Sequence, residues 1–267
     1  MESLRYTQRV SRELTKRLAD RQRALPLSAE RDGQRVPFAL GLVEGSAASE
    51  LLDSRADYLH PREIDVLSSY RSAQRQSNFA LGRWVAKQAL LALAPGTEPR
   101  ELEIAAGVFG QPCVRGLASP PALSLTHTQR GAIAIASEPG HIIGVDLESL
   151  AERHDETFLR SLTAHEQALL SAVGAPDAAP PGLAWTLKEA LSKALRCGFT
   201  VPLPIFELKS FEPHAAGGFR ALFQNFAQYQ GRAWQLGAGA LAIVLPKNTS
   251  LELPPSAKDA IARLCAG

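Results

Sequence analysis

The chain has 267 residues, of which 45% are hydrophobic and 21% are charged, as in a globular protein that can bury a core. Its net charge of +2 is too small to indicate nucleic-acid binding. Its three cysteines form no C-x-x-C pair, which excludes a disulfide framework and a zinc site of that kind and fits a reducing compartment. No apolar run reaches the roughly 18 residues of a membrane span, and the N-terminus lacks a signal peptide's apolar core. We therefore expect a cytoplasmic protein that binds neither membranes nor nucleic acid.

The first part of the chain predicts mostly helices. Apolar residues spaced four apart indicate an N-terminal helical extension over residues 1–30; they are Tyr6, Val10, Leu14 and Leu18. A short strand at residues 36–43 is followed by helices at 49–58 and 61–69 and by a longer helix from residue 71 to the Pro95-Gly96 stop. Four basic side chains lie along this longer helix, at Arg71, Arg75, Arg83 and Lys87. Such a track usually forms a solvated face, and it gains a function only where an anionic ligand is indicated independently.

Four short strands are predicted next, at residues 102–105, 108–114, 122–128 and 131–136. His127 lies near the end of the third of these strands, between the hydroxyl side chains of Thr126 and Thr128. A lone histidine is usually a structural hydrogen-bonding residue, but one beside two hydroxyls can also bind a phosphate.

The stretch Ile142 to Glu148 combines an apolar strand pattern with two carboxylates. We expect it to pair with the strand before it. Since side chains alternate along a strand, Asp146 and Glu148 point to the same face. Adjacent carboxylates repel each other, and Mg²⁺ held by both of them together with substrate phosphates would neutralise them. The alternative is a strand that ends in solvent, because D-x-E matches are frequent.

After Glu148 the pattern changes to helices and then to strands. Thr163 and Glu166 form a capping-box pattern, and residues 183–195 predict a helix that ends before Gly198. Glu189 and Lys193 lie four apart on this helix, which as structure stabilises it by only about 0.2–0.5 kcal/mol. As chemistry, the two residues could add a third carboxylate and an ammonium to the same site. The remaining predicted elements are strands at 206–208, 219–223, 233–236 and 238–245 and a short helix at 257–266.

Three motifs of the chain resemble those of the Sfp-type 4′-phosphopantetheinyl transferases and occur in the same order along the sequence. The family's G-[IV]-D-x-E element stands at residues 144–148, its W-[STC]-x-K-E-[AS]-x-x-K element at 185–193, and its S-[IL]-[ST]-H-[ST] element at 124–128. The likeness covers roughly residues 36–245. It implies an α+β fold of two pseudo-symmetric halves, each a small, mostly antiparallel sheet packed with a long helix. We expect a nucleotide-binding half at residues 31–143, a half with the metal and catalytic motifs at 144–255, and a C-terminal helix or tail at 256–267.

The resemblance also implies an enzymatic activity. The enzyme is expected to be a monomer whose active site lies between the two halves. The family transfers the 4′-phosphopantetheine arm of coenzyme A to a serine of an acyl or peptidyl carrier protein, with Mg²⁺, and releases adenosine 3′,5′-bisphosphate. Asp146, Glu148 and Glu189 are implied as the Mg²⁺ ligands, and Glu189 also as the group that takes the serine proton. Asp146, Glu189 and Lys193 are the implied catalytic set, in which Lys193 neutralises the leaving phosphate.

The residues implied for coenzyme A are Arg75, Arg83, Thr126, His127, Lys188 and Lys193. Lys188 is expected either to contact the substrate or to orient its helix. One position departs from the family, because its usual G-K-P turn is Gly110-Gln111-Pro112 here. Without a charge at Gln111, phosphate binding is expected to depend more on Arg75, Arg83 or Lys87.

Two other functions use the same residues. A metal-dependent phosphohydrolase acting on coenzyme A or nucleotides would need the same three carboxylates, with water as the nucleophile. A non-catalytic carrier-binding subunit would be favoured by a missing signature residue, and none is missing from these motifs. For carrier docking, the candidates lie in the segment 157–182 and are Phe158, Leu162, Leu169 and Leu170, which could equally pack onto the core.

Overall fold

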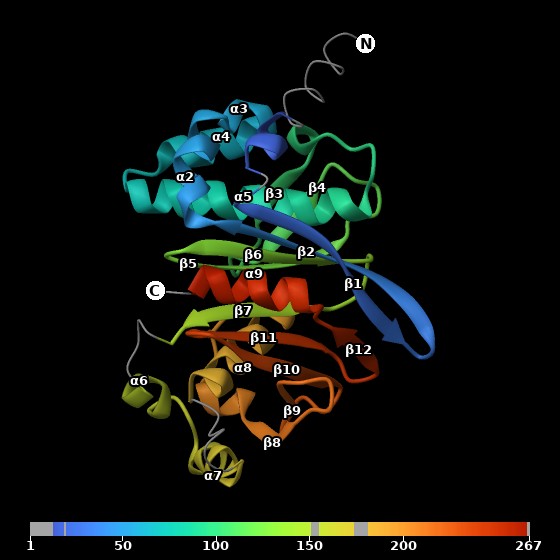
Figure 1. Ribbon diagram of the computed structural model, residues 1–267, viewed down its shortest axis with the longest axis vertical. Coiled ribbons are helices and arrows are strands. Elements are labelled where there is room, and N and C mark those ends of the chain that lie inside the picture. Colours follow the sequence, from blue (N-terminus) through green and yellow to red (C-terminus); the bar gives the residue numbers. More distant parts are fainter. Residues whose placement is uncertain (1–12, 19, 151–154, 174–180, 266–267) are drawn as a thin grey trace. The chain divides into compact units, whose positions relative to one another are not determined.

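The computed structural model of the chain describes residues 13–18, 20–150, 155–173 and 181–265. The chain divides into two compact units, whose elements Figure 1 colours along the sequence. Unit 1 comprises Met1–Leu27, Pro37–Val108 and Pro112–His141, and unit 2 comprises Ser28–Val36, Phe109–Gln111 and Ile142–Gly267. Each unit contains an antiparallel sheet packed against a long helix, which confirms the predicted α+β class. None of the described helices is long and apolar enough to cross a membrane.

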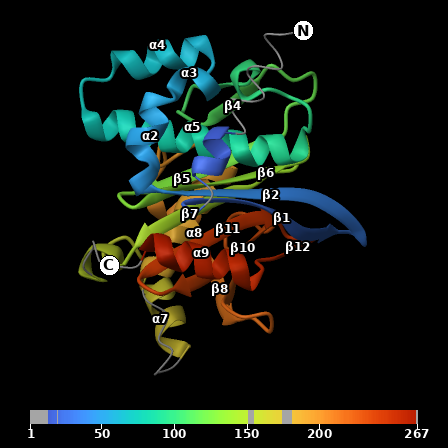
Figure 2. The same cartoon turned by 45° about the horizontal axis from the view of Figure 1, so that its top comes forward.

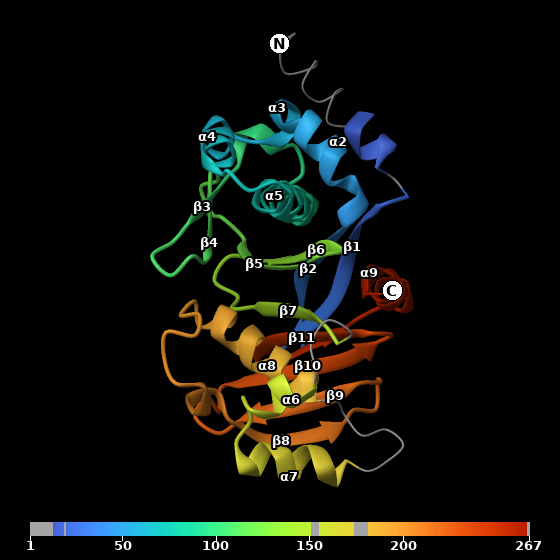
Figure 3. The ribbon, with the colours of Figure 1, turned by 90° about the vertical axis from the view of Figure 1, so that its left-hand side faces the viewer.

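The sheet of unit 1 is covered by one long helix, α5 (Ala73–Leu93). Its antiparallel strands follow the order β2 (Gln34–Glu44), β6 (Gly131–Ser137) and β5 (Ala122–Thr128). The alanines of β6 that point toward α5 belong to the same apolar cluster as its Trp84 and Val85. A Cβ atom on Gly41 of β2 would lie 2.5 Å from the carbonyl oxygen of Val85, so only glycine lets the helix approach the strand this closely. Figure 3 shows α5 end-on, lying against this sheet.

Smaller elements of unit 1 surround α5. They are η1 (Gly45–Ala47), α2 (Ala48–Asp53), α3 (Arg55–Tyr58), α4 (Pro61–Ser69), η2 (Pro99–Glu101) and the hairpin of β3 (Glu103–Ala106) and β4 (Pro112–Arg115). Helix α4 begins as expected with Pro61 in its first turn, and His60 and Glu63 close a capping box there.

Residues 22–30 differ from the expectation of a helical extension over residues 1–30. Residues 13–17 are helical, but β1 (Gln22–Arg31) begins soon afterwards, and Tyr6 and Val10 lie outside the described residues. The strand forms because Leu27 and Ala29 are buried between exposed neighbours, a period of two. In unit 2, its residues Ser28–Arg31 pair with β12 (Thr249–Glu252).

Unit 2 contains a second antiparallel sheet with a helix on each face. The strand order is β7 (Gly144–Ser149), β11 (Gly239–Pro246), β10 (Tyr229–Leu236), β9 (Phe219–Phe223) and β8 (Leu208–Pro213). Helix α8 (Pro181–Ala194) packs on the face that includes Ala240, Ala242 and Val244. Helix α9 (Pro255–Cys265) lies against β10 and β11 on the other face (Figure 2), where a Cβ on Gly239 would meet Cys265. The unit also holds α6 (Asp155–Leu159), α7 (Ala164–Ala172) and η3 (Leu203–Phe206).

The expected pairing of β7 with the strand before it is wrong. Asp146 lies opposite Ala242 of β11, so β7 opens the second sheet instead of extending the first. Gly144 explains this choice, because a Cβ there would lie 1.9 Å from the carbonyl oxygen of Ala190. Because Gly144 has no side chain, β7 can lie directly against α8, and α8 packs on the second sheet.

Candidate active site

The two carboxylates of β7 point toward helix α8. Asp146 is paired with Ala242 and Glu148 with Ala240, and both alanines belong to the apolar cluster that packs against α8. The two acidic side chains therefore share one face of the strand, as the sequence alternation predicted. Asp146 is buried, with 4% of its surface exposed, and Glu148 is half-buried.

Helix α8 presents three side chains on the face that lies opposite the two carboxylates of β7. The indole Nε1 of Trp185 donates to Oε1 of Glu148 at 2.8 Å, and Nζ of Lys193 donates to Oδ1 of Asp146 at 2.6 Å. Glu189 follows Trp185 by four residues and precedes Lys193 by four, so it lies between them on the same face. The antiparallel match of helix and strand thus places the third carboxylate opposite the row formed by the other two.

The ion pair between Lys193 and Asp146 sets the charge of this site. The Lys193 side chain is 28% exposed and the Asp146 side chain 6%, so the ammonium reaches solvent while the carboxylate does not. A buried carboxylate beside a second one requires a cation, and Lys193 supplies it in this structure.

The carboxylates suit Mg²⁺ chemically, since hard cations take oxygen ligands. Among the described residues, no three Asp, Glu, His or Cys side chains converge closely enough to hold a metal by themselves. Mg²⁺ commonly takes only one or two protein carboxylates and completes its shell with water and substrate phosphates. One or two of Asp146, Glu148 and Glu189 therefore fit Mg²⁺ that arrives with a phosphate ligand.

Lys188 belongs to the packing of α8 and not to a surface that a substrate could touch. Its side chain is completely buried, and its Nζ lies 2.6 Å from Oε2 of Glu166 and 3.1 Å from the carbonyl oxygen of Ser161. Of the two roles expected for Lys188, the orientation of its helix fits this position and contact with coenzyme A does not.

The candidates of unit 1 on strand β5 lie on opposite faces of that strand. Thr126 and His127 are adjacent in the strand, so their side chains must diverge. Thr126 is buried, whereas His127 is exposed and pairs with Ala132 on the face that α5 covers. One phosphate group on one face of β5 could therefore meet only one of the two side chains.

The two arginine candidates of α5 also differ in exposure. Arg75 is exposed, and its guanidinium lies 6.0 Å from the ring centre of Tyr70. Arg83 is mostly buried, with Nε 3.3 Å from Oε1 of Glu63 and its guanidinium 4.3 Å from the ring centre of Phe79. Burial lowers the pKa of Arg83, although the charge of Glu63 opposes this shift.

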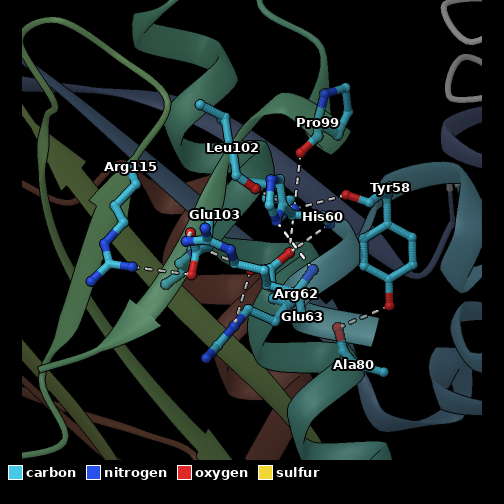
Figure 4. A network of polar contacts seen from close by, with 12 residues as sticks. Tyr58, His60, Arg62, Glu63, Ala80, Pro99, Leu102, Glu103 and Arg115 are labelled. Carbon is cyan, nitrogen blue, oxygen red and sulfur yellow. Dashed lines mark hydrogen bonds and ion pairs between the residues drawn. The ribbon is translucent and has the colours of Figure 1, made fainter. Parts of the chain in front are cut away.

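Lys87 is not available to a ligand, which corrects its place among the candidates for phosphate binding. Its Nζ lies 2.6 Å from Oε2 of Glu63 and donates to the carbonyl oxygens of Tyr58, Pro99 and Leu102 at 2.8–2.9 Å. Figure 4 shows the surrounding network, in which the dashed lines from Tyr58, Pro99 and Leu102 converge. A fully buried ammonium with four such acceptors holds α5 to its neighbours.

The apolar candidates for carrier docking serve the core of unit 2. Phe158, Leu162 and Leu170 are buried, and Leu169 is half-buried against the same cluster. The packing role that the sequence allowed for them is the one observed, and the segment 174–180 lies outside the described residues.

Neither Glu63 nor Glu166 was expected from the sequence to pair with a buried lysine. A signal for both pairs does exist, because Trp84-Val85-Ala86-Lys87 in unit 1 and Trp185-Thr186-Leu187-Lys188 in unit 2 share the pattern W-x-x-K. Each lysine meets the glutamate that closes the capping box of a short preceding helix, α4 or α7.

Comparison with known proteins places the matching part of the chain in unit 2. Residues 142–245 match the family model described as the 4′-phosphopantetheinyl transferase superfamily. Over residues 142–245, this match agrees with the predicted family at the level of the superfamily and with phosphopantetheinyl transferase as the class of enzyme. No curated protein matches the sequence.

Among the solved structures that are similar to the chain, two share 18% sequence identity with it. One is a holo-(acyl-carrier-protein) synthase from Bacillus anthracis str. Ames in complex with CoA (3′,5′-ADP), with a TM-score of 0.36 over 43% of this chain and 100% of that chain. The other is the holo-[acyl-carrier-protein] synthase of Thermotoga maritima, with a TM-score of 0.31 over 52% of this chain and 74% of that chain. Both TM-scores lie below 0.5.

Proposed function

Because residues 142–245 match the 4′-phosphopantetheinyl transferase superfamily, we propose that the chain transfers the 4′-phosphopantetheine arm of coenzyme A to a serine of an acyl or peptidyl carrier protein. The reaction depends on Mg²⁺ and releases adenosine 3′,5′-bisphosphate. The observation that supports this most is the face of α8 that carries Trp185, Glu189 and Lys193 opposite the carboxylates of β7. Carboxylates that can bind Mg²⁺ and an ammonium that can neutralise a leaving phosphate suit a phosphoryl transfer of this kind.

The roles of these residues follow from where charge develops. Attack of the serine oxygen on the β-phosphorus forms one P–O bond and breaks the bond to the departing nucleotide phosphate, which keeps the electron pair. Asp146, Glu148 and Glu189 are the residues that would hold Mg²⁺ with the pyrophosphate, and the metal would supply charge neutralisation at the phosphoryl oxygens. Glu189 is the half-buried carboxylate of this set on α8, and it takes the serine proton directly or through a water molecule. Lys193 reaches solvent from beside Asp146 and can neutralise the leaving phosphate.

For the 3′-phosphate of coenzyme A, the exposed basic groups of unit 1 are the better candidates. Arg75 and His127 are both exposed, so we assign the contact to them. Arg83 is largely buried beside Glu63, and Thr126 is buried on the other face of β5 from His127, so neither is assigned this contact. The chain has three cysteines and no C-x-x-C pair, which supports the cytoplasm as the place of this reaction.

Intact-mass spectrometry tests the proposal directly. An apo acyl or peptidyl carrier protein is incubated with the enzyme, coenzyme A and Mg²⁺, with and without a chelator, and Asp146→Asn serves as the matched inactive control. We expect the carrier to gain one phosphopantetheine, only with metal and only with the wild-type enzyme. Metal-dependent breakdown of coenzyme A without any gain by a varied panel of carriers would instead indicate a phosphohydrolase. If neither reaction occurs, the result would indicate a non-catalytic carrier-binding subunit.

A further inference from the structure

A buried ion pair behind α8 lies outside the chemistry proposed above. The side chains of Lys188 and Glu166 are both 0% exposed, and their charged atoms are 2.6 Å apart. Oε2 of Glu166 also accepts a hydrogen bond from the backbone N–H of Thr163 at 2.8 Å, and Oε1 accepts one from the N–H of Leu208 at 3.0 Å. The pair therefore joins three elements of unit 2, namely α7, α8 and β8.

The chemistry of this pair makes it a fixed point. A buried carboxylate without its cation is costly, so α8 cannot rotate or slide without either breaking the pair or moving α7 and β8 with it. A flexible apolar contact would allow such small movements, whereas each acceptor of the Lys188 ammonium restricts its direction. The orientation of α8 about its own axis is thus set on the side of the helix where Lys188 lies.

Lys188 directly precedes Glu189, so fixing one side chain fixes the direction of the next. Successive side chains on a helix diverge by about 100°, since a turn holds 3.6 residues. With Lys188 held toward α7, Glu189 is turned toward the face that carries Trp185 and Lys193. We infer that Glu166 is a positioning residue of the proposed transferase, which through Lys188 holds Glu189 opposite the carboxylates of β7. This inference rests on the proposed function of Glu189.

Unit 1 contains the same pair of a capping-box glutamate and a buried lysine, but no residue like Glu189 after the lysine. Glu63 closes the capping box of α4, accepts the N–H of Ile104 at 2.9 Å and pairs with Lys87 at 2.6 Å. The residue after Lys87 is Gln88, at the position that Glu189 holds after Lys188. Glu63→Gln is therefore the control, because it removes the same charge from a buried lysine pair next to a residue that carries no charge; it also removes the ion pair of Glu63 with Arg83.

The experiment compares Glu166→Gln with Glu63→Gln in two measurements. One is the steady-state rate of carrier modification against Mg²⁺ concentration and pH, and the other is calorimetric titration of Mg²⁺ into the enzyme with coenzyme A and no carrier. We expect Glu166→Gln to lower kcat and weaken Mg²⁺ binding by about tenfold each, a change of roughly one decade in each constant. Glu63→Gln should unfold at a lower denaturant concentration, as Glu166→Gln does, and keep wild-type values of both constants. Lys188→Arg, which retains the positive charge, should lose less of kcat and of Mg²⁺ affinity than Glu166→Gln does.

Folding and function can be separated in this design. If Glu166→Gln does not fold, Glu166→Leu with Lys188→Met removes both charges and leaves no buried ion, and it should fold and still lose about tenfold in kcat. A folded Glu166 variant with wild-type kcat and Mg²⁺ affinity overturns the inference, as does an equal loss in Glu63→Gln. A wild-type enzyme that modifies no carrier contradicts the proposed function instead.

Discussion

At the scale of single residues, the carboxylates of β7 and α8 are where the proposed chemistry is concentrated. We expect Asp146→Asn and Glu189→Gln each to lower kcat by about a hundredfold or more, because each removes a negative oxygen that a metal or a proton needs. Intact-mass kinetics with an apo carrier measures this. Urea unfolding should show that both variants remain folded, since Lys193 can turn its ammonium to solvent when Asp146 loses its charge. An Asp146→Asn enzyme with full activity would exclude this residue from the metal site.

Lys193 allows a finer prediction about the step at which it acts. Lys193→Ala should lower kcat by about 10- to 100-fold and change the affinity for coenzyme A by less than threefold, because the charge on the leaving phosphate exists mainly in the transition state. Steady-state kinetics and calorimetry with coenzyme A separate the two effects. A large loss of affinity with an unchanged kcat would show instead that Lys193 binds the ground state.

The chemical identity of these residues could be predicted from the sequence, but their exposure could not. Asp146, Glu148 and Glu189 were identified by spacing and resemblance, and β7 and α8 do bring them to facing surfaces. Lys87 and Lys188 were interpreted as possible ligand contacts, because a lysine on a helix is usually solvated. Their burial depends on glutamates more than twenty positions earlier in the chain, and helical periodicity carries no information about such partners.

At the scale of elements, the approach of α8 to β7 depends on a missing side chain. A methyl group at Gly144 would lie 1.9 Å from the carbonyl oxygen of Ala190, so Gly144→Ala must push α8 away from β7. We expect it to lower the free energy of unfolding by about 2–4 kcal/mol and to lower transfer activity beyond what stability explains, because Glu189 and Lys193 move with the helix.

Gly82→Ala is the matched control for this prediction. Gly82 lies inside α5, and a Cβ there would meet only Cδ1 of Leu125 at the ordinary distance of 3.8 Å. Because alanine favours the helix over glycine, this variant should gain up to about 1 kcal/mol. Urea unfolding of both variants checks the difference, and equal stability of the two would contradict the close approach.

Most elements were predictable, and the exceptions have physical causes. The capping box of Thr163 and Glu166, the helix α8 and the meander from β8 to β11 follow local patterns, so the sequence sufficed for them. Strand β1 was missed because its charged residues, such as Arg23 and Glu30, obscure a period of two that only Leu27 and Ala29 express. The partner of β7 was mistaken because β11 is about a hundred residues away, and pairing at that distance depends on packing with α8.

At the scale of the whole molecule, the two units repeat one construction. Both place a capping-box glutamate against the lysine of a W-x-x-K helix, and both bring a strand glycine close to that helix, at Gly41 and Gly144. Unit 1 has Gln88 where unit 2 has Glu189. The shared parts are therefore those that assemble each unit, and the residues unique to unit 2 are those assigned to the metal and the proton.

The buried pair of unit 1 makes the stability of the whole chain depend on pH. Burial lowers the pKa of Lys87 to about 8 from the value of 10.5 expected in the unfolded chain, even though Glu63 favours the charged form. Between these two values the unfolded chain binds more protons at this residue than the folded chain, so stability rises with pH through this window. Burial raises the pKa of Tyr58, whose contribution is lost only above about pH 10. The free energy of unfolding should therefore gain about 2 kcal/mol from Lys87 between pH 7.5 and about 9.5. Urea unfolding across this range, with Lys87→Met as the reference, isolates the gain from other titrating groups, and parallel curves for the two proteins would mean that Lys87 keeps its proton in the folded chain.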